Sequence, residues 1–217
     1  MRNIVLGSEQ DLWWNWAVAE LDSARFGDAF RRWIPTDLQT RVLANRRDDL
    51  TVDDWAQLKT AVLNVRFPIL LDLLLLGTDW YLGDLDSIEL PSLRVMNYEP
   101  HVRLAPSRNL AALAKELDAG RNPPGEDEFG NNYRTIRDAF LLDRARGRPI
   151  LVAEDSSGPF TMLEGYTRMT AMTSLAAAER IHIPSVPILL GVCPRLHDWH
   201  QYGVWQGRLL RTERSLF

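Results

Sequence analysis

The chain has few of the features that mark secreted or membrane-bound proteins. It contains one cysteine, Cys193, which excludes an internal disulfide framework and fits a reducing compartment. Its most hydrophobic segment, Ile69 to Leu76, is about half the length of a membrane-spanning helix and includes Asp72. The segment from Met1 to Gly7 has too short an apolar run for a signal peptide. We therefore expect a soluble, cytoplasmic protein with no membrane partner.

Positive charge is also in short supply. The 25 lysine and arginine residues are outnumbered by 29 aspartate and glutamate residues, which gives a formal net charge of −4. This acidic balance argues against a broad, non-specific nucleic-acid surface. The acidic excess lies in residues 1–90, which carry 9 basic and 15 acidic side chains. Residues 91–217 have a slight basic excess and leave room for a local basic patch.

The motifs of several common enzyme classes are missing. The sequence has no phosphate-binding P-loop, no Gly-x-Ser-x-Gly nucleophile elbow and no paired Cys-x-x-Cys. It has no internal repeat or low-complexity segment. His197 and His200 are three residues apart and could share a metal ion on a helix, but the spacing places no third ligand beside them. These absences leave less common site chemistries to consider.

Residues 1–88 are predicted to form a mostly helical, acidic, tryptophan-rich region. Ser8 can cap a first helix, and Thr51 opens a second one with a one-sided apolar stripe. Pro68 suits the first turn of a third helix. Six of the eight tryptophans lie in this region. Buried core anchors would explain them, and a docking surface for a protein partner is the alternative.

Residues 89–217 are predicted to alternate between short strands and helices. Residues 118–133 are rich in glycine, proline and asparagine, and are too long and polar for a simple connection, so we expect an inserted loop or lid there. Residues 155–158 carry a hairpin signal between two apolar strands. The expected elements are strand 90–98, helix 107–117, helix 135–146, strands 149–153 and 160–163, helix 167–179, strand 183–192 and a short helix 194–202 before a basic tail.

The sharpest local feature runs from Glu164 to Arg168. A strand ends, Gly165 permits close backbone approach, Thr167 can cap, and a helix begins. Such a junction directs free backbone N–H groups and the positive end of a helix dipole at one spot. Arg168 adds a guanidinium fork suited to phosphate or carboxylate, and Glu164 could accept a proton or hold a metal ion. The alternative is a structural turn with a surface ion pair.

These residues resemble the ParB/sulfiredoxin-like superfamily. The strand Pro149 to Val152, the hairpin, and then Gly165, Arg168 and Ala171 fill its Gly-x-x-Arg-x-x-Ala pattern. The resemblance extends back to a first strand, an arginine-bearing turn with Arg103 and a first helix, and forward to a closing strand. It covers residues 90–195, about half of the chain. It implies an α+β fold, with a small mixed sheet and helices, preceded here by the helical region.

Members of this superfamily differ in the residues of the motif. Sulfiredoxins carry a reactive cysteine and a histidine at positions that correspond here to Tyr166 and Thr167, so sulfinic-acid reduction is not expected. Partition proteins bind CTP through a Gly-Glu-Arg-Arg box. Of the two arginines in that box, this sequence keeps only Arg168. Free serine kinases of this fold resemble the motif more closely, although their histidine is Thr167 here.

The resemblance implies a nucleotide-phosphate site in which Gly165, Tyr166, Thr167 and Arg168 hold the phosphates. Arg103 would be a second phosphate anchor, and Glu164 the catalytic base. We accordingly predict a phosphotransferase or phosphohydrolase that uses Mg²⁺ and a nucleoside triphosphate or diphosphate. The alternative is a non-catalytic module, switched by a nucleotide, that binds a protein or DNA partner through the helical region.

Overall fold

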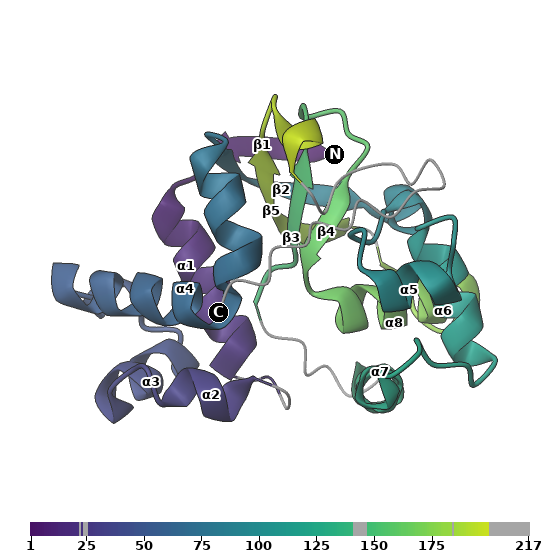
Figure 1. The fold of residues 1–217 in the computed structure, drawn as a ribbon, viewed down its shortest axis with the longest axis horizontal. Helices are drawn as coiled ribbons and strands as arrows, with labels where there is room; N and C mark the ends of the chain where they lie inside the picture. The colour runs from purple at the N-terminus through teal and green to yellow at the C-terminus, as the bar shows by residue number, and fades with distance from the viewer. Residues whose placement is uncertain (22, 24–25, 141–146, 184, 200–217) are drawn as a thin grey trace.

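A mixed sheet with helices on both faces makes this an α+β protein, as the sequence predicts (Figure 1). The structure is a computed structural model that describes residues 1–21, 23, 26–140, 147–183 and 185–199. Within these ranges five strands follow the order β1-β2-β5-β3-β4. The strands are β1 (Arg2–Leu6), β2 (Asp79–Asp86), β3 (Ile150–Ala153), β4 (Thr161–Glu164) and β5 (Ser185–Val192). His200 and the expected basic tail lie outside the described residues.

The central strands are buried on both faces of the sheet. β3 runs parallel to β5, whereas the β1–β2, β2–β5 and β3–β4 pairs are antiparallel. Along β3 the side chains alternate, so that Ile150 and Val152 face one hydrophobic core while Leu151 and Ala153 face the other. Burial on both sides explains why β3 and β5 have continuous apolar sequences.

The N-terminal helices cover the first face of the sheet (Figure 1). Trp13, Trp14, Trp16 and Trp80 are buried in the core beneath them, which supports the interpretation of the tryptophans as core anchors. Trp33 differs, because 53% of its surface is exposed. The helices of this layer are α1 (Glu9–Leu21), α2 (Gly27–Arg31), α3 (Thr36–Leu43), the 3₁₀ turn η1 (Arg47–Asp49) and α4 (Val52–Leu75).

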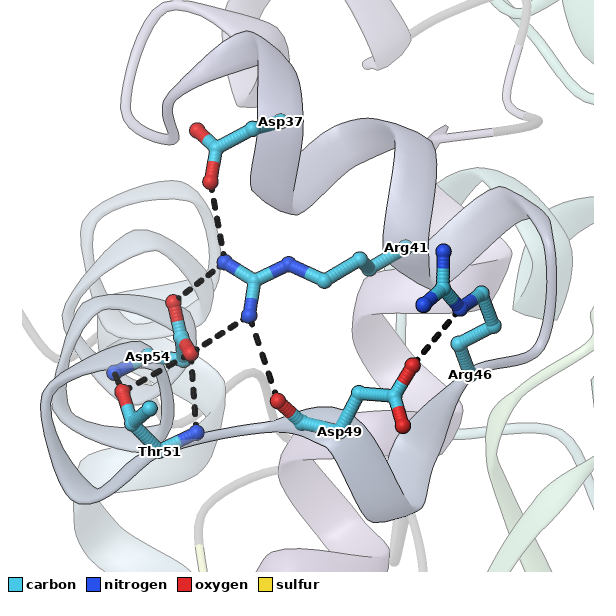
Figure 2. Close-up of polar contacts among 6 residues, drawn as sticks. All are labelled: Asp37, Arg41, Arg46, Asp49, Thr51 and Asp54. Carbon is cyan, nitrogen blue, oxygen red and sulfur yellow. Dashed lines mark hydrogen bonds and ion pairs between the residues drawn. The ribbon is translucent and has the colours of Figure 1, made fainter.

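A charged network fixes the start of α4 against α3 (Figure 2). Thr51 and Asp54 form a capping box in which each side chain accepts a hydrogen bond from the other residue's backbone N–H. Both terminal nitrogens of Arg41 lie 2.7 Å from the Asp54 carboxylate, and one also lies 3.0 Å from Asp37. The network joins α3 to α4 and confirms Thr51 as the cap.

The helix expected to begin near Pro68 is the second half of α4. The backbone leaves helical geometry at Arg66, with φ −124° and ψ 17°, and then continues as a helix to Leu75. A proline disfavours helical geometry before it and removes one backbone donor, which accounts for a kink at this point. One kinked helix therefore replaces the two predicted ones.

The second face of the sheet is covered by helices from the C-terminal part (Figure 1). The carboxylate of Asp118 accepts hydrogen bonds from Tyr133 at 2.6 Å, Arg137 at 3.0 Å and Ser174 at 2.7 Å, which ties three helices together. The helical elements of the C-terminal part are η2 (Ser87–Ser92), α5 (Glu99–Leu104), α6 (Leu110–Asp118), α7 (Asp127–Phe140) and α8 (Tyr166–Ala177). The 3₁₀ turn η3 (Leu196–Asp198) follows β5.

The sheet combines strands from both predicted parts of the chain. Residues 1–88 contribute β1 and β2, which the prediction of a mostly helical region omitted, and β2 pairs with β5 along its whole length. The strand predicted for residues 90–98 is wrong. Asp86 and Glu89 form a capping box that starts η2, and the sheet contact that remains is an isolated bridge at Arg94.

The predicted loop at residues 118–133 is also corrected by the structure. Helix α7 begins at Asp127, eight residues before the helix expected from Thr135. Phe129 and Tyr133 are buried in the second core, and this burial outweighs the low helix propensity of Gly130 and Asn131. The connection between α6 and α7 is therefore short.

None of the helices in the described ranges combines the length and the apolar character needed to cross a membrane.

Candidate functional site

The junction between β4 and α8 has the geometry expected from the sequence. Gly165 adopts φ +91° and ψ 15°, in the left-handed region that favours glycine. A Cβ atom at this position would lie 3.2 Å from the Pro149 Cβ and 3.4 Å from Arg168 Nη2. Helix α8 begins at Tyr166, so Thr167 lies within the first turn and is not the cap. The first N–H groups of α8 have no intrahelical partners, as at any helix start.

Tyr166 belongs to the packing between the two cores. Its hydroxyl donates to the Met162 carbonyl and accepts from the Met96 N–H at 2.8 Å. Its ring lies 5.5 Å from that of His101, measured between centroids. Burial raises the pKa of the Tyr166 hydroxyl far above its ordinary value. This hydroxyl therefore holds β4, α8 and the segment near Met96 together.

Arg168 contacts both Gly147 and Glu164. Its Nη1 donates to the Gly147 carbonyl at 2.8 Å, and its Nη2 lies 3.9 Å from Glu164 Oε2. The side chain is only 12% exposed, so its direction is fixed by the surrounding structure. The structure therefore brings Arg168 to Gly147 and to Glu164, which lies four residues before it in the chain.

A cleft of about 650 Å³ lies between the N-terminal helices and α8. Its described walls come from six segments of the chain: α1, the turn around η1, strand β2, the loop before β3, helix α8 and the start of β5. Its charged lining residues are Asp11, Arg47, Asp48, Arg148 and Arg168, and the rest of the lining is Trp14, Asn15, Val18, Asn45, Leu82, Gly147, Pro149, Met172, Ser185, Val186 and Pro187.

The charges in the cleft are only partly compensated. Asp11 pairs with Arg47 at 2.5 Å. Burial raises the pKa of Asp11, but hydrogen bonds from Arg47 and Ser8 outweigh it and leave the pKa below its usual value. Arg148 donates its backbone N–H to Asn15 at 3.1 Å, and within the described ranges its guanidinium has no carboxylate partner. Arg148 and Arg168 thus give this wall of the cleft a positive character.

Glu164 lies beside Arg168 but is not among the described lining residues of the cleft. Its side chain is about one-fifth exposed, and its Oε2 atom is buried and accepts no hydrogen bond. Its negative charge acts on Glu20 of α1. The carboxylate predicted as the catalytic base therefore lies beside Arg168 and outside the described lining of the cleft.

Arg103 takes a different position from the other predicted site residues. It lies on α5, where it pairs with Glu99 at 2.5 Å, and two-thirds of its side chain is exposed. Nor does it line the described part of the cleft. The structure brings Arg168 to the cleft and leaves Arg103 on the surface of α5.

The cleft also contains residues that sequence reasoning missed. Arg47, Arg148 and Asn15 come from three segments that meet only in the folded chain. One local signal could have pointed to Arg148. It lies between Gly147 and Pro149, immediately before the strand that precedes the glycine–arginine motif, so it is expected to lie near that motif in the fold. Nothing in the local pattern around Asn15 distinguishes it from other helical residues.

Among the described residues, no three His, Cys, Asp or Glu side chains are grouped so that they could hold a metal ion. His197 lies 3.2 Å from Glu154, and both side chains are exposed. Its expected companion His200 falls in the part of the chain that is not described.

Comparisons of the chain with models of protein families, with curated proteins and with solved structures found no match. The case for a function therefore depends on the geometry of the cleft.

Proposed function

We propose that the protein binds a nucleotide through its phosphates in the cleft between α1 and α8. The observation that carries this proposal is the convergence of Arg148 and Arg168, from two segments of the chain, on one cleft. Its volume of about 650 Å³ lies within the range of small-molecule sites. Guanidinium groups bind phosphate through two parallel hydrogen bonds, so two of them can fix a polyphosphate.

Other parts of the cleft suit the remainder of such a ligand. Asn45 offers an amide group that can donate and accept hydrogen bonds, whereas the Asn15 amide is already bonded to the Asp11 carbonyl and the Arg148 N–H. Trp14, Met172 and Val186 provide apolar lining of the kind that contacts a base or sugar. A site with a charged wall and an apolar wall fits a nucleotide better than it fits inorganic phosphate alone.

Among the described lining residues of the cleft, one carboxylate is available to hold Mg²⁺. Asp11 is already bonded to Arg47 and Ser8, whereas Asp48 is exposed and has no ion pair in the described part of the chain. Mg²⁺ in nucleotide sites is held by one or two carboxylates together with the phosphates, so Asp48 is the residue that would hold it. A bound Mg²⁺ would neutralise phosphate charge.

Nucleotide binding without turnover is the form of the proposal that the geometry favours. A general base must come within about 3 Å of the proton that it removes, directly or through one water. The carboxylate of Glu164 lies 3.9 Å from Arg168 and outside the described lining of the cleft, which suits a role in positioning Arg168. A Mg²⁺-dependent phosphotransferase or phosphohydrolase, with Glu164 as base, is the competing hypothesis.

A non-catalytic, nucleotide-switched module needs a partner whose binding depends on the nucleotide. Trp33 on the N-terminal helical region is more than half exposed, unlike the buried tryptophans around it. We include a protein partner on this region as part of the proposal, since exposed tryptophan is enriched where proteins meet.

Thermal-shift measurements test the binding. The wild-type protein is heated with ATP, ADP, CTP or GTP, each with and without Mg²⁺, beside Arg168→Ala. A ligand at ~100 times its dissociation constant stabilises the fold by about 2.7 kcal/mol, which raises Tm by several degrees. We expect one nucleotide to give this shift in the wild type and a much smaller one in Arg168→Ala.

The matched control is Arg121→Ala. Arg121 pairs with Glu116 on α6 and lies outside the described lining of the cleft, so this variant should respond as the wild type does. The absence of a shift with every nucleotide in the folded wild-type protein would overturn the proposal. If the wild type instead releases phosphate from a nucleotide, and Glu164→Gln abolishes this release, the result would support the competing enzyme hypothesis.

A further inference from the structure

Residues 147–149 form a short segment that lines the cleft just before β3 begins. The carbonyl of Gly147 accepts a hydrogen bond from Arg168 of α8 at 2.8 Å. The carbonyl of Pro149 accepts one from the Leu189 N–H of β5 at 2.9 Å. Both ends of this segment are therefore bonded to elements of the C-terminal part of the chain.

The middle residue of the segment is bonded to the N-terminal layer instead. The Arg148 N–H donates to Asn15 Oδ1 of α1 at 3.1 Å. Asn15 is 6% exposed, and its Nδ2 donates to the Asp11 carbonyl, one helical turn earlier, at 2.8 Å. A side-chain amide has an acceptor at one end and a donor at the other, so a single orientation of Asn15 satisfies both partners.

The segment lies directly against α1. Gly147 has φ +72°, and a Cβ atom there would lie 3.4 Å from Val18 Cγ1 and 3.6 Å from the carbonyl oxygen of Asn15. Glycine accepts this left-handed conformation and leaves no side chain between the segment and the helix. The close approach lets the short side chain of Asn15 reach the backbone of Arg148.

We propose that Asn15 is a positioning residue of the phosphate site, which fixes the backbone of Arg148 so that its guanidinium is ready to bind an anion. This inference rests on the proposed function. The Asn15 amide is bonded to Asp11 and Arg148, so it acts on the ligand through Arg148. A residue whose backbone is already fixed loses less conformational freedom when the ligand binds.

The effect should run in both directions. If the bond from Arg148 to Asn15 favours anion binding, a bound anion must favour that bond by the same factor. The Arg148 N–H should therefore exchange with solvent more slowly when the cleft is occupied. The N-terminal layer thus takes part in the phosphate site, although neither of the two arginines that would bind the anion belongs to it.

Asn15→Ser isolates this contact. A serine hydroxyl in a helix can donate to the carbonyl four residues earlier, as the Thr60 hydroxyl does to Ala56 at 2.8 Å, so the bond to Asp11 can be kept. The serine side chain is one bond shorter than that of asparagine and leaves the Arg148 N–H without its acceptor.

The matched control is Asn64→Ser. Asn64 on α4 is exposed, donates to the Thr60 carbonyl at 2.9 Å through the same kind of intrahelical bond, and lies outside the described lining of the cleft. This variant should therefore behave as the wild type does in every measurement below.

Amide hydrogen exchange followed by ¹H–¹⁵N NMR tests the contact without any ligand. The Arg148 N–H should exchange at least about tenfold faster in Asn15→Ser than in the wild type. Saturating pyrophosphate should slow this exchange in the wild type by at least about threefold. The second comparison uses only the wild type, so it still tests the proposal if Asn15→Ser does not fold.

Pyrophosphate binding, measured by calorimetry, tests the role in the site. Asn15→Ser should weaken binding by about fivefold to tenfold, the effect of one lost hydrogen bond. In an Arg148→Ala background the same substitution should change the affinity by less than about twofold, because its effect passes through Arg148. A purely structural role would lower Tm but leave the affinity of the folded protein unchanged.

The outcomes separate the possible failures. Exchange at Arg148 that Asn15→Ser leaves unchanged, or that pyrophosphate does not slow in a wild type that binds it, overturns the positioning role. An unchanged affinity in Asn15→Ser, or an equal loss with and without Arg148, overturns it as well. A wild type that binds neither pyrophosphate nor any nucleotide contradicts the proposed function, and with it any role of Asn15 in binding, whatever the exchange rates show.

Discussion

At the scale of single residues, Gly165 does the most to shape the β4–α8 junction. Its φ of +91° brings the start of α8 against Pro149 and directs Arg168 back toward Gly147. The sequence revealed this role, because a glycine between an apolar strand and a helix predicts such a turn. It could not reveal Arg148 or Asn15, whose positions depend on contacts between segments more than a hundred residues apart.

Gly165→Ala should destabilise the protein by about 2–3 kcal/mol. The new Cβ would be strained at positive φ and would also crowd Pro149. Gly125→Ala is the control, since Gly125 has φ +74° but no heavy atom within 4 Å of the position that a Cβ would take, and it should cost about 1 kcal/mol. Urea unfolding of the two variants measures the difference, and equal losses would show that the contact with Pro149 is unimportant.

At the scale of elements, the start of α4 shows how one charged network orders two helices. Asp54 accepts hydrogen bonds from Arg41 and from the backbone of Thr51, and these interactions lower the pKa of its carboxyl to about 2 (Figure 2). A carboxyl group with a lowered pKa stabilises the fold above its unfolded pKa of about 3.9, and this contribution disappears as the pH falls toward its folded value.

Asp54→Asn should therefore destabilise the protein by about 1–2 kcal/mol at neutral pH, and by progressively less between about pH 4 and pH 2. Asp37→Asn is the control, because Asp37 bonds the same arginine but is mostly exposed, and it should have a much smaller effect. Urea unfolding across this pH range measures both. A penalty for Asp54→Asn that stays constant down to pH 2 would contradict the role of its charge.

Some helices and strands were predictable from the sequence and others were not. Strands β3 and β5 and helix α8 follow from apolar runs and a glycine signal that are local in the chain. Strand β2 was missed because Asp79, Asp84 and Asp86 make it look like a polar connection, and because its partner β5 is about a hundred residues away. Helix α7 was predicted to start late because Gly130 and Asn131 are weak helix formers.

At the scale of the whole molecule, the two parts expected from the sequence share one sheet and both contribute to the first hydrophobic core. β2 lies between β1 and β5, and the first core joins residues from α1 and α4 to residues of β3 and β5. The hydrogen bond from the Arg148 backbone N–H to the Asn15 side chain crosses the same boundary. These contacts predict that the parts depend on each other for stability.

Residues 89–217 expressed alone should therefore fail to fold cooperatively. Without β2 the long edge of β5 is exposed, and without α1 and α4 one face of β3 loses its cover. Thermal unfolding followed by circular dichroism should show one transition for the full chain and none for the fragment. A sharp transition in the fragment would show instead that the boundary at residue 88 separates two independent domains.

The central claim is that a nucleotide binds in the cleft through Arg148 and Arg168. Amide chemical-shift mapping by ¹H–¹⁵N NMR, with the nucleotide that gives the largest thermal shift, tests it most directly. We predict saturable shifts grouped at Asn15, Gly147, Arg148 and the first turn of α8, and their loss in Arg168→Ala. Saturable shifts grouped on another face of the molecule, or no shifts with any nucleotide, would contradict the account.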